Sequence, residues 1–285
     1  MPSFRLDRFL TLNFFHPLVK KTSLHNDVRI PILMYHSISE DSENSVHPYF
    51  RINTSPALFA EHAQYLHDHN YAVINLADLT TFFSAKNKVP SRCVVLTFDD
   101  GYRDFHTRAF PVLNTYNFTA TVFLPTGAIE NRNQKLRGKE HLTWKEVNEL
   151  SKHEIIFGSH TVTHPQLSTM SREATEYEIS KSKETIEDKV GKKADSFSYP
   201  FKFPEELKDF TRYLRELLKK YGYVNGVSTR IGTAVTGDDT YFLKRIPVNS
   251  YDDLSFFRAK LDGGYDWLHR LQYFKKLTRR QTHYV

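Results

Sequence analysis

The sequence predicts an α/β fold in which about seven parallel strands, connected by helices, come close to a closed (β/α) barrel. Short apolar runs rich in β-branched residues alternate with longer amphipathic stretches, which is typical of a parallel sheet with crossover helices. The 285 residues are a length that single α/β barrels commonly reach, so we expect one main domain. Hydrophobic residues at 40% and aromatic residues at 14% are enough for a large core and exclude general disorder.

Seven apolar runs are the expected strands. In chain order they are Ile30–Tyr35, Tyr71–Leu76, Cys93–Phe98, Ala120–Leu124, Ile155–Gly158, Ser196–Tyr199 and Tyr223–Ser228. A further apolar run, Phe242–Val248, follows the polar segment 232–240, which we expect to be a hairpin or an excursion from the sheet. Cys93 is the single cysteine, so it cannot form an internal disulfide and is expected to be a small buried side chain.

Helix start signals precede several amphipathic stretches. Ser55 followed by Pro56 predicts an N-cap and a first helical residue for a helix that reaches His69. Thr143 and Glu146 form a capping-box pattern ahead of another helix. Further helices are expected from Pro204 to Gly222, near Arg103–Tyr116 and over Arg172–Val190.

Both ends of the chain are basic and partly apolar. Residues 1–30 carry five Lys/Arg and two Asp, and residues 258–285 carry seven Lys/Arg and two Asp, so the middle of this chain of net charge +6 is slightly acidic. Basic ends fit an anionic membrane surface, an acidic polymer or simple solubility. We therefore expect an N-terminal basic and apolar extension over 1–29, the barrel over 30–261 and a C-terminal basic amphipathic helix over 262–285.

Neither end has the pattern of an ordinary signal peptide or a membrane span, because charged residues interrupt the apolar ones. At each end an interfacial helix and a helix docked on the domain remain alternatives. The expectation is a cytoplasmic protein, with peripheral membrane contact through the basic ends left open. No nucleic-acid partner is expected, since the basic residues lie at the ends and no zinc-finger or RNP-like motif is present.

The most informative residues follow two of the expected strands. Asp99 and Asp100 come directly after one apolar run, and His160 and His164 follow another about sixty residues later. In a barrel the carboxyl ends of parallel strands meet at the face where active sites lie, and His36 also falls there. One carboxylate and two imidazoles would then face a divalent metal, with the second carboxylate free to act as a base.

The ligand types narrow the choice of metal. Imidazole and carboxylate ligands suit zinc first, with cobalt, nickel, iron and manganese as alternatives. His160 and His164 are four residues apart, a spacing that puts both side chains on the same side of a helix or a strand. Three protein ligands leave a position open for water, which is typical of catalytic sites. We assign Asp100 to the metal and Asp99 to the base, which the nearby cation would keep ionised.

Each motif alone has a simpler interpretation. An Asp-Asp-Gly sequence is more often a turn, and two histidines four apart are more often surface residues. Their joint occurrence at two strand ends favours the metal site.

These motifs resemble those of the NodB-homology polysaccharide deacetylases, carbohydrate esterase family 4. Thr97–Tyr102, TFDDGY, is similar to the family's first motif, and Ser159–His164, SHTVTH, is similar to its second. Ile32–His36 and Ser198–Phe201 are similar to segments of the bacterial exopolysaccharide branch, and the similarity extends from about residue 31 to 261. The resemblance implies a distorted (β/α) barrel with fewer than eight strands that hydrolyses N-acetyl, or sometimes O-acetyl, groups of a sugar polymer.

The resemblance also implies roles for individual residues. Asp99 would be the catalytic base, and the metal ligands would be Asp100, His160 and His164. The backbone amide of Phe201 would stabilise the oxyanion, with Tyr102 and Tyr199 as further substrate or oxyanion residues. The expected substrate is an N-acetylated glycan or a lipid-linked sugar.

The sequence departs from the family pattern at three points. Ser198 stands where many members carry an arginine that orients the base, and Lys202 replaces a usual glycine. The late Leu-x-His that supplies the general acid has no match, and His36 is a candidate substitute. A packed, hydrogen-bonded His36 is the alternative, and a catalytically impaired carbohydrate-binding or scaffold protein is the alternative function. A related hydrolase of a non-sugar amide is the third hypothesis.

Overall fold

The structure is a computed structural model that describes residues 5–22, 29–85, 90, 92–131 and 135–281. Parts of the expected terminal segments, 1–29 and 262–285, therefore lie outside the described residues.

Seven parallel strands close into a ring, which confirms the expected distorted (β/α) barrel. Around the ring they are β2 (Ile32–Tyr35), β12 (Leu243–Pro247), β10 (Asn225–Ile231), β9 (Ser196–Ser198), β8 (Ile155–Ser159), β7 (Ala120–Leu124) and β6 (Cys93–Phe98), which pairs again with β2. Short strands outside the ring are β1 (Arg29–Ile30), β3 (Ser37–Ile38), β4 (Asn53–Thr54) and β11 (Ala234–Val235). The sequence run that contains Cys93 is buried throughout, as expected for a strand covered on both faces.

Six of the seven expected strands belong to the ring, and one does not. The run expected over 71–76 does form a strand, β5 (Ala72–Ile74). Among the described strands it pairs only with the first half of β6, at the edge of the sheet, and so lies outside the ring. The late run supplies β12 instead, which pairs with β10 on one side and β2 on the other and so closes the ring. The segment before it is an excursion, as expected, in which β11 pairs antiparallel with β1.

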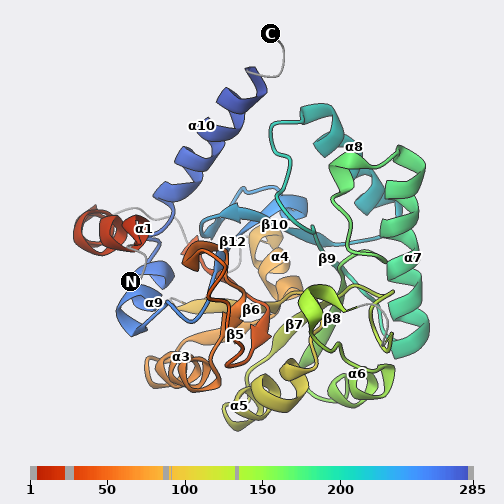
Figure 1. Ribbon diagram of the computed structural model, residues 1–285, viewed down its shortest axis with the longest axis horizontal. Helices are drawn as coiled ribbons and strands as arrows, with labels where there is room; N and C mark the ends of the chain where they lie inside the picture. Colours follow the sequence, from red (N-terminus) through yellow and green to blue (C-terminus); the bar gives the residue numbers. More distant parts are fainter. Residues whose placement is uncertain (1–4, 23–28, 86–89, 91, 132–134, 282–285) are drawn as a thin grey trace.

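Helices surround the ring of strands, as Figure 1 shows. They are α3 (Pro56–Asp68), α4 (Leu76–Ala85), α5 (Phe110–Thr115), α6 (Trp144–Leu150), α7 (Arg172–Val190), α8 (Lys208–Lys220) and α9 (Leu254–Leu261). The N-cap of α3 and the capping box of α6 are both formed as expected. Helix α8 begins at Lys208 rather than at Pro204, because the chain first makes a turn in which the Leu207 amide donates to the Pro204 carbonyl.

The two terminal helical segments pack against each other beside the barrel. The N-terminal segment runs through α1 (Leu6–Leu10), a π-helical turn (Thr11–Phe15) and α2 (His16–Thr22), and the C-terminal one is α10 (Trp267–Gln281). The rings of Phe15 and Trp267 stack at 4.4 Å, and the Tyr265 hydroxyl donates to Asp7 at 2.7 Å. Further along α10, His269 and Lys276 contact Glu205 of the barrel at 2.8 and 2.6 Å, and the end of the helix extends past the strands (Figure 1).

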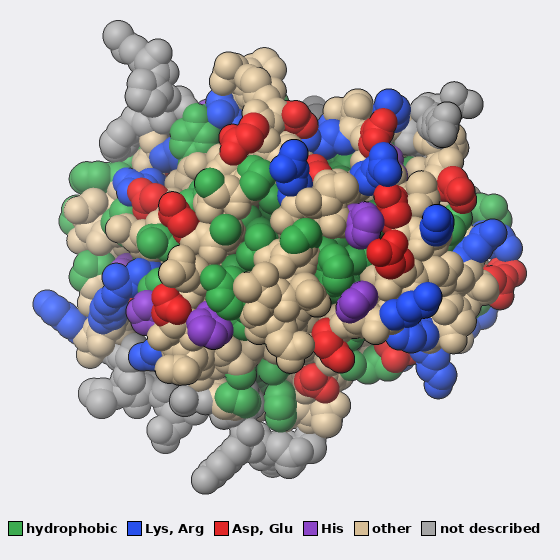
Figure 2. All heavy atoms as spheres, turned by 90° about the horizontal axis from the view of Figure 1, so that it is seen from below, with side chains coloured by type: hydrophobic (Ala, Val, Ile, Leu, Met, Phe, Trp, Pro, Cys, Tyr) green, Lys and Arg blue, Asp and Glu red, His purple; other side chains and the backbone are tan. Residues whose placement is uncertain are grey.

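The molecular surface mixes charges of both signs. Figure 2 shows the lower face of the molecule in Figure 1, where acidic and basic side chains are interspersed among smaller groups of hydrophobic ones. Within the described ranges, every helix is too short or too polar to cross a membrane.

Candidate metal centre

Asp100, His160 and His164 converge at the carboxyl ends of β6 and β8. The Oδ1 atom of Asp100 lies 3.2 Å from Nε2 of His164 and 3.4 Å from Nε2 of His160, and all three atoms lie within 4.8 Å of one another. Two ligands that bind one zinc ion tetrahedrally at about 2.1 Å are themselves about 3.4 Å apart. The Asp100 oxygen therefore lies at the separation from each imidazole nitrogen that a shared divalent cation requires.

An unpartnered buried oxygen gives a second indication that the site fits a cation. Asp100 is buried, yet its Oδ1 atom has no hydrogen-bond partner among the described residues. Burial would raise the pKa of Asp100, but the two imidazoles hold it well below its usual value. An ionised oxygen in the interior that accepts no hydrogen bond is costly unless something positive binds it. The donor set of one carboxylate and two imidazoles suits a divalent metal.

Neighbouring groups orient the two histidines. Nδ1 of His160 donates to the carbonyl of Ser198 at 2.8 Å, which directs Nε2 toward Asp100. Such a hydrogen bond on the far ring nitrogen is how metal-binding histidines are usually held. Glu178 on α7 holds the loop between the histidines, because its carboxylate accepts from the amides of Val162 at 2.7 Å and Thr163 at 2.9 Å.

Backbone strain is concentrated at this centre. Among the described residues eight non-glycine residues have a positive φ, and half of them belong to the site: Asp100 at 69°, Thr161 at 69°, His164 at 56° and Phe201 at 56°. Each such residue costs about 1 kcal/mol or more relative to a right-handed conformation. The surrounding fold keeps them there, which is a property of functional sites.

Asp99 lies beside this cluster and is clamped by an arginine that the sequence analysis did not identify. Nη1 and Nη2 of Arg245 donate to the two carboxylate oxygens of Asp99, each at 2.7 Å. Arg245 is 0% exposed and Asp99 only 3%. Burial would raise the pKa of Asp99, but Arg245 holds it below its usual value, so the carboxylate is ionised. The one feature of the sequence that could have revealed Arg245 is its position as a charged residue inside the apolar run Phe242–Val248.

Arg245 supplies a guanidinium for the base, although Ser198 stands where many family members carry an arginine. The serine hydroxyl lies 3.3 Å from both oxygens of Asp99 and accepts from Nη2 of Arg245 at 3.0 Å. A guanidinium thus does contact the expected base, but it comes from β12 and not from the third motif. Nε of Arg245 also donates to the Ser228 carbonyl at 3.1 Å, which fixes its plane.

His36 follows β2 and lies at the same mouth of the barrel. Burial lowers the pKa of His36, while the negative charges of Asp100 and Asp99 oppose that effect. The residue is half-buried, and the charges of both carboxylates act on its side chain.

A second histidine, which the sequence analysis did not single out, lies nearby. The rings of His141 and Tyr102 are 5.3 Å apart, and the two residues form an isolated antiparallel bridge. His141 is 8% exposed, and neither ring nitrogen has a hydrogen-bond partner within the described part of the chain. Burial lowers its pKa, and the charge of Asp100 opposes this. His141 belongs to no motif, and only the bridge to Tyr102 brings it here.

Phe201 and Tyr199 have different positions. Phe201 is 54% exposed and its ring lies 4.8 Å from that of His164, so it borders the opening as expected. The side chain of Tyr199 instead packs against the buried rings of Phe197 and Phe203, both at 4.9 Å. Its expected role in substrate contact is therefore not met, because successive strand residues point to opposite faces and Ser198 takes the face toward Asp99.

Comparisons with known proteins identify the class to which this fold and site belong. The family model described as polysaccharide deacetylase matches residues 86–226. Bacillus subtilis YxkH, named provisionally as a polysaccharide deacetylase, is 32% identical over 237 residues, which cover 82% of this chain and 76% of the relative. The chain belongs to the polysaccharide deacetylase family, whose enzymes are hydrolases acting on carbon–nitrogen (amide) bonds.

Two further relatives agree with this assignment. The poly-β-1,6-N-acetyl-D-glucosamine N-deacetylase of Staphylococcus aureus is 24% identical over 249 residues, which cover 84% of this chain and 78% of that protein. The structure of Streptococcus pyogenes deacetylase PplD in complex with acetate has a TM-score of 0.73 at 25% identity, covering 83% of this chain and 99% of that one.

Proposed function

We propose that the protein removes N-acetyl groups from a glycan or glycan precursor, with a divalent cation held by Asp100, His160 and His164. The observation that carries this proposal is the buried Oδ1 atom of Asp100, which has no hydrogen-bond partner among the described residues and lies 3.2 and 3.4 Å from two imidazole nitrogens. The printed name of the Staphylococcus aureus relative, an N-deacetylase of an acetylglucosamine polymer, supports a glycan substrate. Zinc is the proposed metal, with cobalt, nickel, iron and manganese as alternatives.

The reaction adds water to the acetamido carbon and breaks the carbon–nitrogen bond, so that acetate leaves and the sugar nitrogen gains a proton. A bound cation supplies Lewis acidity, which polarises the carbonyl and acidifies water. Asp99 accepts a proton from water. Its two oxygens are each held by Arg245, but a carboxylate oxygen can accept more than one hydrogen bond. Arg245 therefore acts as a positioning residue that keeps Asp99 ionised and oriented.

The remaining roles fall to residues at the barrel mouth. The backbone amide of Phe201 is proposed to donate to the oxyanion, a contact commonly worth about 3 kcal/mol of barrier. His36 is proposed as the general acid that protonates the leaving nitrogen, because it directly follows β2, at the same end of the barrel as Asp99 and Asp100. Tyr102 is buried near Asp100, whose negative charge adds to the effect of burial in raising the pKa of the phenol. Its hydroxyl therefore stays protonated and is able to donate to substrate.

The test combines metal content with acetate release from N-acetylglucosamine oligomers. The wild type is expected to contain one divalent metal and to lose activity in chelator, with recovery on adding zinc. Asp99→Asn is expected to keep the metal and lose at least about a hundredfold in rate, whereas Asp100→Asn should lose the metal as well. A wild type that binds metal but releases acetate from no acetylated glycan would support the alternative of an impaired, carbohydrate-binding protein.

We also propose that the terminal helices contact an anionic membrane surface, where a lipid-linked sugar would be accessible. Leu6, Phe14 and Leu18 are exposed on the N-terminal segment, and Lys20 and Lys21 follow in its last turn. Exposed apolar side chains next to lysines fit the boundary of an anionic bilayer.

Co-sedimentation with phosphatidylglycerol vesicles tests this contact. Phe14→Glu is expected to reduce binding, while Tyr177→Glu, an exposed aromatic on α7, serves as the matched control. Equal binding of wild type and Phe14→Glu would contradict the proposal.

A further inference from the structure

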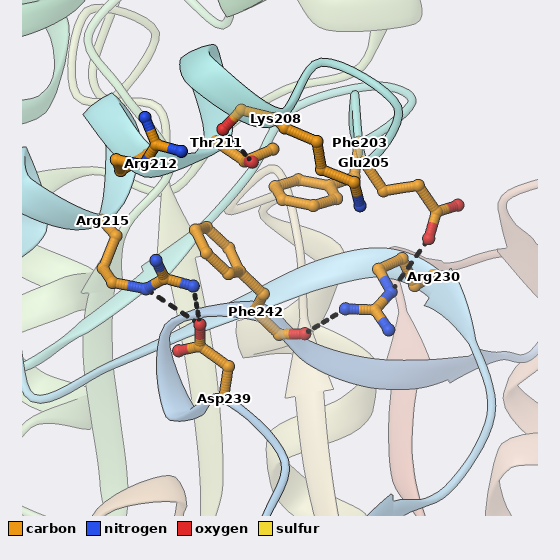
Figure 3. A pocket seen from close by; sticks show the side chains of 9 residues that line it. All are labelled: Phe203, Glu205, Lys208, Thr211, Arg212, Arg215, Arg230, Asp239 and Phe242. Atoms are coloured by element: carbon orange, nitrogen blue, oxygen red, sulfur yellow. Dashed lines mark hydrogen bonds and ion pairs between the residues drawn. The ribbon is translucent and has the colours of Figure 1, made fainter.

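A basic cavity lies along the segment that follows Phe201. It has a volume of about 370 Å³ and is enclosed by α8, the end of β10 and the segment before β12. Figure 3 shows Lys208, Arg212 and Arg215 reaching it from α8 and Arg230 from β10, with the rings of Phe203 and Phe242 between them. Four cationic side chains therefore surround a space with a partly aromatic floor.

The carboxylates of this cavity are already neutralised by other groups. Nε of Arg215 donates to Asp239 at 2.9 Å. The carboxylate of Glu205 forms ion pairs with Lys276 at 2.6 Å, with His269 at 2.8 Å and with Arg230 at 3.2 Å. These cations lower the pKa of Glu205 to about 2 against the opposing effect of burial, so it stays ionised and fully paired.

The cavity consequently has positive charge that no carboxylate in it balances. Lys208 lies 5.8 Å over the Tyr273 ring and pairs with no carboxylate among the described residues. Arg212 binds Asp209 at 3.1 Å, but both side chains are well exposed, so water screens this pair. The first turn of α8 adds backbone amides that no N-cap side chain accepts, since Leu207 occupies that position.

The cavity is close enough to the metal centre to act on the same molecule. Phe203 lines it and follows Phe201 by two residues, and the ring of Phe201 lies 4.8 Å from that of His164. Two extended residues span at most about 7 Å between their Cα atoms. A glycan that followed this segment from the metal centre would therefore reach the basic cavity.

We propose that this cavity binds an anionic substituent, a phosphate or a carboxylate, of the glycan that is deacetylated at the metal centre. The proposal rests on the proposed function for its substrate, but the binding site stands on its own residues. Guanidinium groups match such oxyanions with paired hydrogen bonds, and an ammonium group adds a point charge. The aromatic floor excludes water on one side, which strengthens these contacts.

The experiment compares three N-acetylglucosamine oligosaccharides that differ at one end: a neutral one, one with a terminal phosphate and one with a terminal uronate. The metal-loaded wild type is expected to show a higher kcat/KM for an anionic oligosaccharide, mainly through KM, and the advantage should shrink as salt is added. Lys208→Gln and Arg230→Gln are expected to reduce the anionic-to-neutral ratio about tenfold, the size of one charge-assisted hydrogen bond. Lys152→Gln, an exposed lysine near α6, is the matched control.

A binding measurement separates this proposal from the proposed function. Calorimetry with N-acetylglucosamine 1-phosphate is done on Asp100→Asn, which lacks a metal ligand, alone and combined with Lys208→Gln. If the Lys208→Gln replacement weakens binding of N-acetylglucosamine 1-phosphate, this result supports an anion site in the cavity, even if no substrate is deacetylated. Preference for phosphate or uronate identifies the source of the anion. Equal kcat/KM for all three oligosaccharides, or binding unaffected by Lys208→Gln and Arg230→Gln, would overturn the proposal.

Discussion

Replacement of Arg245 by methionine is the most direct test of how the centre is built. The guanidinium is 0% exposed and donates to both oxygens of Asp99 at 2.7 Å. Arg245→Met would leave Asp99 as a buried carboxylate without its counter-charge. Breaking one side of a buried pair costs about 3–5 kcal/mol, so we expect a loss of that size in the free energy of unfolding.

The same variant should change the pH dependence of catalysis. Burial raises the pKa of Asp99 and Arg245 lowers it, so the pKa of the carboxyl should rise when the guanidinium is removed. A base with a raised pKa is protonated at acidic pH, and acetate release should therefore fall on the acid side and recover as pH increases. Arg245→Lys keeps the charge but not the paired geometry, so it should restore much of the pH profile and only part of the rate.

Stability is measured by urea unfolding of protein stripped of metal by a chelator, so that a bound cation does not mask the effect. Arg215→Met is the matched control, because its pair with Asp239 is about one-third exposed and such pairs contribute at most about 1 kcal/mol. The reasoning would be refuted if Arg245→Met were as stable as Arg215→Met and kept the wild-type pH profile.

Three further outcomes are expected. Glu178→Gln should weaken zinc binding about 10- to 100-fold in a chelator competition, because Glu178 holds the loop between the two histidines; an unchanged affinity would contradict that role. The pKa of Glu205 is lowered from 4.5 to about 2, so its contribution of about 3 kcal/mol should be present above pH 4.5 and lost as pH falls toward 2; unfolding curves of Glu205→Gln should lack this loss. His36→Gln should reduce acetate release at least about a hundredfold with metal content unchanged, while a larger effect of His141→Gln would make His141 the acid.

Local patterns were enough to predict most of the strands, two helix caps and the three side chains that come together as a candidate metal site. Every residue of β6 is buried, which makes Cys93–Phe98 a recognisable run in the sequence, and the candidate ligands follow the ends of β6 and β8. The capping box at Thr143 depends on residues three apart, so it too is visible in the sequence. These features are encoded by neighbouring residues.

The contacts that hold the base and the candidate ligands in place could not be predicted from neighbouring residues. Arg245 is separated from Asp99 by 146 positions, and Glu178 is 16 positions from Val162. His141 reaches the centre through a single bridge to Tyr102. The direction of the Tyr199 side chain depends on which face of β9 turns inward, which an apolar run of three or four residues does not specify.

The amino-acid order alone determined the family, the alternation of strands and helices, and the residues able to bind a metal, because each depends on motifs or on periodicities of a few positions. Only the closed barrel decided which strand completes the ring, which arginine clamps the base and which cations share a cavity, where Lys208 pairs with no carboxylate among the described residues. Those outcomes depend on contacts between distant segments, whose partners are set by ring closure and by the direction in which each side chain points.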